Sequence, residues 1–386
     1  MKFLAVLGTR PEAIKLSPVL TTLRAERGVT THICITGQHR DLTRPILDLF
    51  SLHADLDLEA MVPQQALNPL IARLVERLDP VLVKLAPDRV IVQGDTTTAM
   101  AAALAAFHRG IPVAHVEAGL RTWQNDAPFP EECYRRAIAL IADLHFAPTR
   151  AARDNLAAER LGGEVFVTGN TGIDALDMVL DRLAADPALA AAVEGALPPR
   201  IDGRQEILVT AHRRESFGPP FEAICAALVA LAGREDLEIL FPLHPNPRLR
   251  AAAEQLLGSR PRIRLLPPLP LPCFVRLMQR ARLILTDSGG VQEEAVALGR
   301  DVLVLREVTE RPEGIQAGAA LRVGTDPARI LHAATVRLEA AAPPGTRSHI
   351  YGDGRASRRI VDALLGREVE EFASGWPRIE GLRRIG

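Results

Sequence analysis

The sequence is poor in cysteine and lacks long apolar runs. Its 386 residues include only four cysteines, which are scattered and show no metal-binding spacing. No apolar stretch approaches the roughly 20 residues of a membrane span, and the apolar run before Gly8 is too short for the core of a signal peptide. We therefore expect a cytoplasmic protein with reduced thiols, no metal site and no membrane association.

The chain also lacks an excess of charge of one sign. Its 46 basic side chains nearly balance 47 acidic ones, which argues against a nucleic-acid-binding or membrane-binding surface. An anionic ligand must then be held by a local cluster of residues. The hydrophobic content of 47% is ordinary for a globular protein, and the length exceeds the roughly 250–300 residues at which a single core stops growing. These features together predict two domains.

The strongest local signal lies in residues 283–299, LILTDSGGVQEEAVALG. Three apolar residues read as a strand, and a helix follows the two glycines. Glycine lets backbone approach a ligand closely, and the first N–H groups of a helix lack internal partners and carry partial positive charge. The segment therefore predicts a phosphate site at Ser288, Gly289 and Gly290. The alternative is a tight turn in which Ser288 caps the helix and binds nothing.

Two series of alternating strands and helices follow each other along the chain. The first begins with an apolar strand at Phe3–Leu7, whose turn does not match G-x-G-x-x-G and so gives no support for a dinucleotide cofactor. The second begins at Glu206–Thr210. We predict an α/β fold with two Rossmann-like domains facing a central cleft, at residues 1–170 and 171–365. We expect a C-terminal helix at about 366–386 to pack back on the first domain.

Acidic side chains follow predicted strands of the first series. Asp95 and Glu117 each come just after a strand, and parallel sheets bind ligands beyond the carboxyl ends of their strands. Asp95 has an alternative role as a helix N-cap, whereas Glu117 precedes Ala-Gly and opens no clear helix. Glu131 begins a helix and shares a face with Arg135, so an ion pair there is either surface chemistry or a means of orienting an acid.

Basic side chains occupy similar positions. Arg10 and Lys15 flank the start of the first helix, where they either bind an anion or are simply solvated. His212 ends a strand beside two arginines, which suits an anion, a proton relay or a basic surface patch. Arg10, His212 and Arg311 would then be cations near the glycine-bearing turn, with the carboxylates opposite. An anionic sugar nucleotide fits this arrangement.

Eleven short motifs occur in one order along nearly the whole chain: GTRPEAIKLSPV, TGQHR, QGDTTT, HVEAGLRT, PFPEE, TGN, AHRRE, HPNP, LTDSGGVQEEA, TERPEG and YGDG. Together they closely resemble the bacterial non-hydrolysing UDP-N-acetylglucosamine 2-epimerase family. The resemblance implies a glycosyltransferase-B-like fold, a homodimer and no metal or redox cofactor. It also implies that UDP-N-acetylglucosamine and UDP-N-acetylmannosamine are interconverted, by elimination of UDP to a glycal and its re-addition, for cell-surface polysaccharide synthesis.

The resemblance also assigns roles to residues. The family's catalytic carboxylates match Asp95, Glu117 and Glu131, and its cleft histidine matches His212. Phe274 matches a position beside the uracil, and Lys15 and Arg135 orient carboxylates or phosphates. The family's ligand-binding positions match Arg10, Lys15, Ser288, Gly289, Gly290, Glu294 and Arg311. By analogy, Glu294 accepts hydrogen bonds from the ribose hydroxyls.

The sequence departs from the family around the sugar and the uracil. Positions that differ are Tyr134, Ser216, Leu269, Leu271 and Ala319. Some relatives bind a second UDP-N-acetylglucosamine as an activator; that site is matched by Gln38, His39, Gln65 and His244, but Gln64 replaces its arginine. Four alternatives therefore stay open: a 2-epimerase of a related sugar such as a UDP-diacetamido-uronate, a hydrolysing epimerase, a glycosyltransferase, and a non-catalytic nucleotide-sugar sensor.

Overall fold

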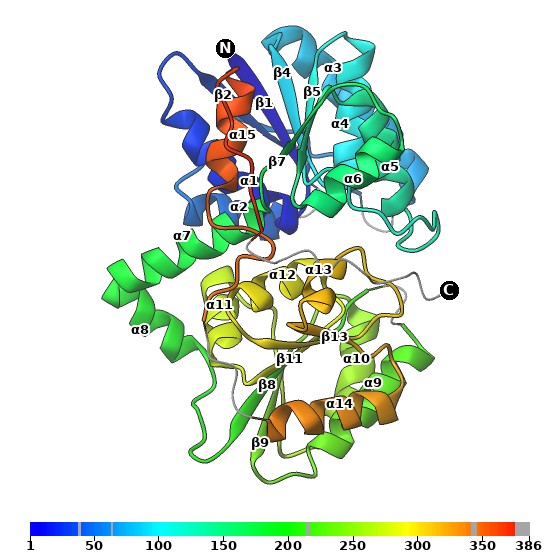
Figure 1. Cartoon of the computed structure of the whole chain (residues 1–386), viewed down its shortest axis with the longest axis vertical. Helices are drawn as coiled ribbons and strands as arrows, with labels where there is room; N and C mark the ends of the chain where they lie inside the picture. Colours follow the sequence, from blue (N-terminus) through cyan, green and yellow to red (C-terminus); the bar gives the residue numbers. More distant parts are fainter. Residues whose placement is uncertain (38–39, 63–64, 214–216, 341–345, 375–386) are drawn as a thin grey trace.

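The computed structural model describes residues 1–37, 40–62, 65–213, 217–340 and 346–374. Two lobes face each other, and each is built on a parallel sheet flanked by helices (Figure 1). The first sheet has seven strands in the order β3-β2-β1-β4-β5-β6-β7, and the second has six in the order β10-β9-β8-β11-β12-β13. The predicted α/β architecture with two Rossmann-like lobes is confirmed.

The first lobe contains the early elements of the chain. They are β1 Lys2–Leu7, α1 Arg10–Arg24, β2 Thr30–Ile35, α2 Arg40–Leu49, β3 Leu56–Asp57, α3 Leu67–Leu85, β4 Arg89–Gln93, α4 Thr97–His108, β5 Val113–Val116, α5 Glu131–Ile141, β6 Leu144–Ala147, α6 Arg150–Ala158 and β7 Glu164–Val167. Two strands were not predicted from the sequence. β3 has only two residues, and β6 follows α5 almost directly, with neither Gly nor Pro between them.

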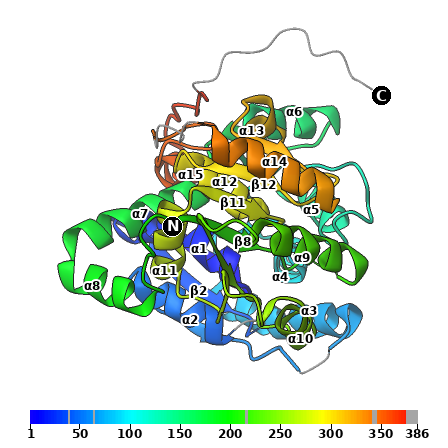
Figure 2. The ribbon, with the colours of Figure 1, turned by 90° about the horizontal axis from the view of Figure 1, so that it is seen from below.

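The second lobe is reached through two helices, α7 Thr171–Ala185 and α8 Pro187–Ala196, which project to one side in both ribbon views (Figures 1 and 2). Its elements are β8 Gln205–Thr210, α9 Pro219–Leu231, β9 Leu237–Pro242, α10 Pro247–Leu257, β10 Ile263–Leu266, α11 Leu271–Arg280, β11 Leu283–Thr286, α12 Gly289–Ala297, β12 Asp301–Val304, α13 Pro312–Gln316, β13 Ala320–Arg322 and α14 Pro327–Glu339. The final helix, α15 Ala356–Leu364, returns to the first lobe.

The lobes share an apolar core around α7. One continuous cluster of buried side chains includes Leu16 of α1, Ile173 and Leu176 of α7, and Ile284 of β11. Helix α7 therefore packs on both lobes at once, because its apolar residues face α1 on one side and α11 and α12 on the other. The predicted boundary at residue 170 directly precedes this helix.

The C-terminal segment packs against the first lobe through α15. Asp174 of α7 accepts hydrogen bonds from the backbone N–H and the hydroxyl of Ser357, at 2.7 and 2.6 Å. Beyond α15, the Phe372 N–H donates to the Val167 carbonyl at 2.7 Å. The helix that packs back is thus α15, and residues 367–374 form no helix, because Gly366 adopts a left-handed φ of 67° after the last turn. The remainder of the predicted 366–386 helix lies outside the described residues.

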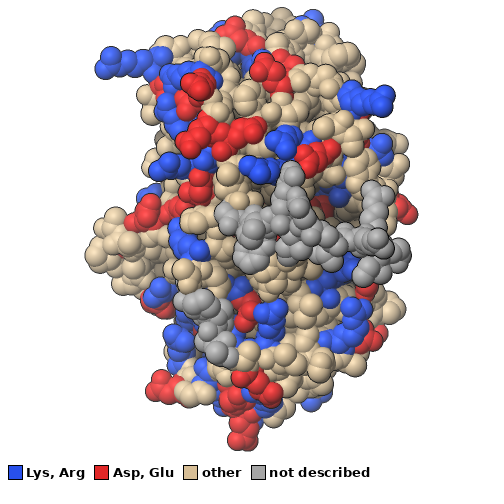
Figure 3. Space-filling model, viewed as in Figure 1, with Lys and Arg blue, Asp and Glu red and all other residues tan. Residues whose placement is uncertain are grey.

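Charge on the surface is mixed. On the face seen in Figure 3, Lys and Arg are interspersed with Asp and Glu over both lobes, as the balanced composition predicts. Within the described ranges, no helix combines the length and the apolar character needed to cross a bilayer.

Candidate active site

The two lobes meet where the strand ends of the first lobe face the start of α12. Arg10, at the first turn of α1, donates from Nη2 to the Leu269 carbonyl of the second lobe at 3.0 Å. Arg311, which precedes α13, places Nη2 3.4 Å from Oε1 of Glu117 in the first lobe. Polar groups predicted from strand ends of separate lobes thus come together in one interface.

Glu117 is held by four side chains. Its backbone lies in the left-handed region at φ 65°, which a non-glycine residue rarely adopts. Oε1 accepts from Lys15 Nζ at 2.5 Å and Asn170 Nδ2 at 2.9 Å, and Oε2 accepts from Gln93. Burial by itself raises the pKa of Glu117, but the charges of Lys15 and Arg311 outweigh it and lower the pKa to about 2. Glu117 is therefore a carboxylate at neutral pH.

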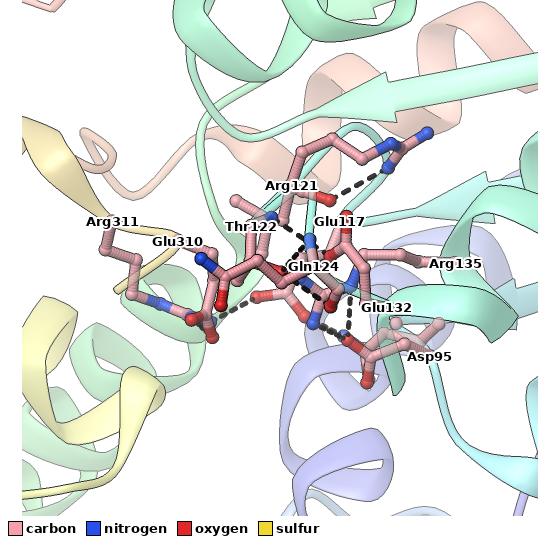
Figure 4. A network of polar contacts seen from close by, with 12 residues as sticks. Asp95, Glu117, Arg121, Thr122, Gln124, Glu132, Arg135, Glu310 and Arg311 are labelled. Carbon is pink, nitrogen blue, oxygen red and sulfur yellow. Dashed lines mark hydrogen bonds and ion pairs between the residues drawn. The ribbon is translucent and has the colours of Figure 1, made fainter. Parts of the chain in front are cut away.

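Asp95 is paired with Arg135 and does not cap a helix. Arg135 donates from Nε to Asp95 at 2.9 Å and also from Nη2. The cap of α4 is Thr96, whose hydroxyl accepts from the Ala99 N–H at 3.0 Å, so the N-cap alternative for Asp95 is wrong. Arg135 also contacts Glu132 at 3.2 Å, and Figure 4 shows these groups joined in one network.

Glu131 has a different environment from Glu117. Its expected ion pair with Arg135 is absent from the ion pairs of the described residues, because that guanidinium is engaged by Asp95. Burial and the nearby Asp95 carboxylate both raise the pKa of Glu131. Two acids of one site thus have pKa values shifted in opposite directions, which is the pattern of an acid and a base.

The start of α12 is open toward the interface. Ser288 occupies the N-cap position, as the alternative interpretation has it, but its side chain makes no capping hydrogen bond. A Cβ at Gly289 would collide with the guanidinium of Arg311, so any other residue there would displace that group from its present place. Arg311 also contacts Glu293 at 2.7 Å and Glu310. A helix end and a buried guanidinium therefore lie side by side, as predicted for Ser288, Gly289 and Gly290.

His212 lies just beyond the end of β8, beside this turn. The buried Asp287 accepts the backbone N–H groups of His212 and Arg213, both at 2.8 Å, and its Oδ1 lies 3.4 Å from His212 Nδ1. Burial lowers the pKa of His212, while Asp287 opposes that shift. The His244 ring stacks on His212, with centroids 5.4 Å apart and planes 6° apart. The carboxylate can fix the tautomer of His212 so that Nε2 is available for a ligand.

A family model described as UDP-N-acetylglucosamine 2-epimerase matches residues 21–365. The chain belongs to this family. The UDP-N-acetylglucosamine 2-epimerase of Escherichia coli strain K12 is 44% identical over 374 residues, which cover 96% of this chain and 100% of the relative.

Solved structures agree with this family assignment. The UDP-GlcNAc 2-epimerase from Neisseria meningitidis, solved with UDP-GlcNAc bound, is 42% identical and has a TM-score of 0.91, covering 95% of this chain and 100% of that one. A glycotransferase of kitacinnamycin, 12% identical, covers 88% of this chain and 91% of that one with a TM-score of 0.55, which indicates a common fold alone. The fold of the family member described here is thus glycosyltransferase-B-like.

Two further residues predicted from the family, Glu294 and Phe274, belong to α12 and α11. Glu294, in the helix itself, has its pKa raised to about 7 by burial, with Lys15 opposing the shift. Burial lowers the pKa of Arg10, and Glu294 opposes that change. Phe274 of α11 is partly buried and packs on the shared core.

The residues predicted for an activator site are divided. Gln38 and His39 lie outside the described residues. Gln65 accepts from the Val62 N–H at 3.1 Å and from Arg73. His244 instead stacks on His212 at the candidate active site, so the structure does not group it with Gln65 by any described contact.

Sequence reasoning missed two residues of this candidate site. Asn170 donates to Glu117 and, at 2.6 Å, to Glu293. The TGN motif that contains Asn170 is one of the eleven family motifs, but the sequence alone assigns this residue no role. Glu293 lies next to Glu294 in the QEE triplet, and sequence reasoning selected only its neighbour.

Proposed function

We propose that the protein is a non-hydrolysing UDP-N-acetylglucosamine 2-epimerase that interconverts the UDP-activated gluco and manno sugars. The observation that carries the proposal is the meeting of Glu117 with Arg311 across the lobes, in a chain that belongs to this family. An acid-bearing strand edge then faces a helix end suited to a diphosphate.

The chemistry of the reaction explains why both the carboxylates and the diphosphate site are needed. The hydrogen at C2 of the sugar is not next to a carbonyl, so its direct removal is unfavourable. Departure of UDP from C1 builds positive charge there and acidifies the C2–H bond, so a carboxylate can remove the proton. UDP must then stay clamped until it is added back with a proton on the other face of C2.

The carboxylates divide this work by their pKa values. Glu117, ionised because of Lys15 and Arg311, suits the acceptance of a proton from C2. Glu131, whose pKa is raised, suits its delivery. In the reverse direction the two groups exchange roles. The ion pair with Arg135 fixes the Asp95 carboxylate, whose negative charge raises the pKa of Glu131.

The UDP group is assigned to the second lobe. Its diphosphate would accept hydrogen bonds from the first N–H groups of α12, at Gly289 and Gly290, and pair with Arg311 and Arg10. The ribose hydroxyls would donate to Glu294, and the uracil would lie beside Phe274 in α11.

A homodimer is part of the proposal. Three neighbouring helices of the first lobe, α3, α4 and α5, expose large apolar side chains: Val83 is 58%, Phe107 60% and Leu140 75% exposed. Apolar side chains gathered on adjoining elements suit a protein interface. Light scattering of the purified protein should give twice the chain mass of 41.8 kDa.

Isotope exchange tests the activity. The protein is incubated with UDP-N-acetylglucosamine in deuterated water and followed by NMR. Both epimers should appear with deuterium at C2, while free UDP stays at a trace level. A single unlabelled epimer would refute the proposal, and stoichiometric free UDP with N-acetylmannosamine would favour a hydrolysing enzyme.

A further inference from the structure

The side-chain amide of Asn170 is fully used. Oδ1 accepts from the Gly172 N–H at 2.9 Å and caps α7, while Nδ2 donates to Glu117 Oε1 at 2.9 Å and to Glu293 Oε2 at 2.6 Å. Rotating the amide by half a turn would set its oxygen against two carboxylates and its nitrogen against an N–H group. The amide therefore has a single satisfactory orientation, and the residue is only 2% exposed.

The backbone of Asn170 is also fixed. Its N–H donates to the Tyr351 carbonyl at 2.7 Å, and its carbonyl accepts from the Ile173 N–H at 3.0 Å. The residue lies between β7 of the first lobe and α7, where the chain crosses toward the second lobe. An amide anchored in this way is a rigid support for the two carboxylates that meet there.

The partners of Glu117 fall into two kinds. Lys15 and Arg311 are cations, and Gln93 and Asn170 are neutral amides. A diphosphate at the α12 end would compete with Glu117 for both cations, because phosphate is an equally strong partner for Lys and Arg. The amides carry no net charge, so phosphate attracts them far less strongly and they stay hydrogen-bonded to Glu117.

Asn170 also separates two acids. Glu117 and Glu293 approach the same guanidinium from different lobes, and each carboxylate raises the free energy of charging the other. Arg311 and Asn170 both lie between them. When the arginine charge is shared with a ligand, the amide remains as the donor common to both.

We propose that Asn170 is a positioning residue that keeps Glu117 ionised and oriented toward the sugar while Lys15 and Arg311 engage the diphosphate. This inference rests on the proposed function and deepens it. The residue acts through Glu117, so its loss should reduce turnover and change its pH dependence, with little effect on the binding of UDP.

The decisive variant is Asn170→Asp. It keeps the volume and the oxygen that caps α7, but it replaces the shared donor with an acid facing Glu117 and Glu293. Losing a charge-assisted hydrogen bond of this kind should slow C2 exchange about 10- to 100-fold in kcat. The acidic limb of the kcat profile should move to higher pH, because the pKa of Glu117 rises. The KM for the UDP-sugar and the Kd for UDP should change less than about threefold.

Two companion variants complete the design. Asn125→Asp makes the same chemical change at an exposed loop residue that accepts from Arg136 at 3.1 Å, and it should leave the kinetics unaltered. Asn170→Ser retains a good N-cap but has no amide donor and adds no charge. It should lower kcat with a smaller pH shift than Asn170→Asp, and it decides the matter if the aspartate variant does not fold.

The outcomes separate the inference from the function beneath it. Absence of C2 exchange in the unmodified protein would remove the proposed function itself. Exchange in the unmodified protein together with normal kcat and pH profile in both Asn170 variants would overturn the inference alone. A loss of thermal stability with unchanged kcat in the folded fraction would also overturn it, because it would reduce Asn170 to a helix cap.

Discussion

The turns before α1 and α12 look alike in sequence, but they differ in how the N-terminus of the helix is capped. Each joins the end of a strand to a helix through glycine. At α1, the Thr9 hydroxyl is positioned to accept the Glu12 N–H, and Glu12 Oε2 accepts the N–H groups of Thr9 at 2.7 Å and Gly8 at 3.0 Å. This capping box satisfies the α1 tip from within the chain. At α12, the Ser288 side chain caps nothing.

The difference separates a structural turn from a candidate ligand site. Basic residues flank the α1 turn, and the sequence alone left open that Arg10 and Lys15 bind an anion there. Glu12 is completely buried and occupies the N–H groups there, so an anion would have to displace a carboxylate. Arg10 instead crosses to the Leu269 carbonyl, and Lys15 turns to Glu117. Three predictions break or sharpen this contrast.

The largest effect is expected at the acid edge of the first lobe. Glu117→Gln removes the charge that Lys15 and Arg311 stabilise, and with it a proton acceptor worth about 10²- to 10⁴-fold in rate. C2 exchange should fall by that factor, and Asp95→Asn should act in the same direction. UDP binding, measured by calorimetry, should survive in both, because the diphosphate is assigned to the α12 turn. Near-normal exchange in both variants would remove these residues from the mechanism.

A second substitution makes α12 resemble α1. Ser288→Asp supplies a capping carboxylate to the open N–H groups, which should stabilise the protein by about 0.5–1 kcal/mol. The same charge should weaken UDP binding at least about tenfold, because it occupies the anion site. Ser288→Ala is the control: it removes the hydroxyl without adding charge and should lie between the two. UDP binding as tight as in the unmodified protein would place the diphosphate away from this turn.

Sequence reasoning found most of one side of the interface. It located the acids Asp95 and Glu117, because in a parallel sheet the residue after a strand lies at the ligand edge. It could not find the bridge from Asn170 to Glu293, since these residues are 123 positions apart and meet only when two separately predicted lobes are placed together. For Asp95, local propensity gave two readings, and the neighbouring Thr96 settled the choice by taking the cap.

The same limit applies to the expected pair of Glu131 with Arg135. Spacing on a helix shows which side chains share a face, but not which partner is better placed. Asp95, in the turn between β4 and α4, accepts the hydrogen bonds of the Arg135 guanidinium instead. Helical spacing therefore predicted the neighbourhood of Arg135 correctly and its partner wrongly.

The smallest predicted effect compares a glutamate on each helix. The Glu12 carboxylate of α1 accepts four hydrogen bonds that are shorter than 3.1 Å. The Glu294 carboxylate of α12 accepts none among the described residues, and burial raises its pKa to about 7. Between the ordinary pKa near 4.5 and 7, the folded state binds more protons than the unfolded state, so stability falls as pH rises through this window. Glu294→Gln abolishes that dependence.

Denaturant unfolding at pH 5 and pH 8 measures the difference. The glutamine variant should gain about 1–2 kcal/mol over the unmodified protein at pH 8, a value reduced because Glu294 is only partly buried, and much less at pH 5. Saturating UDP should reverse the order at pH 8, since ribose hydroxyls donating to the carboxylate stabilise its charged form. If the variant gained the same free energy of unfolding at both pH values, the pKa of Glu294 would not be raised. The assignment of the Glu294 carboxylate to the ribose hydroxyls would then lose its support.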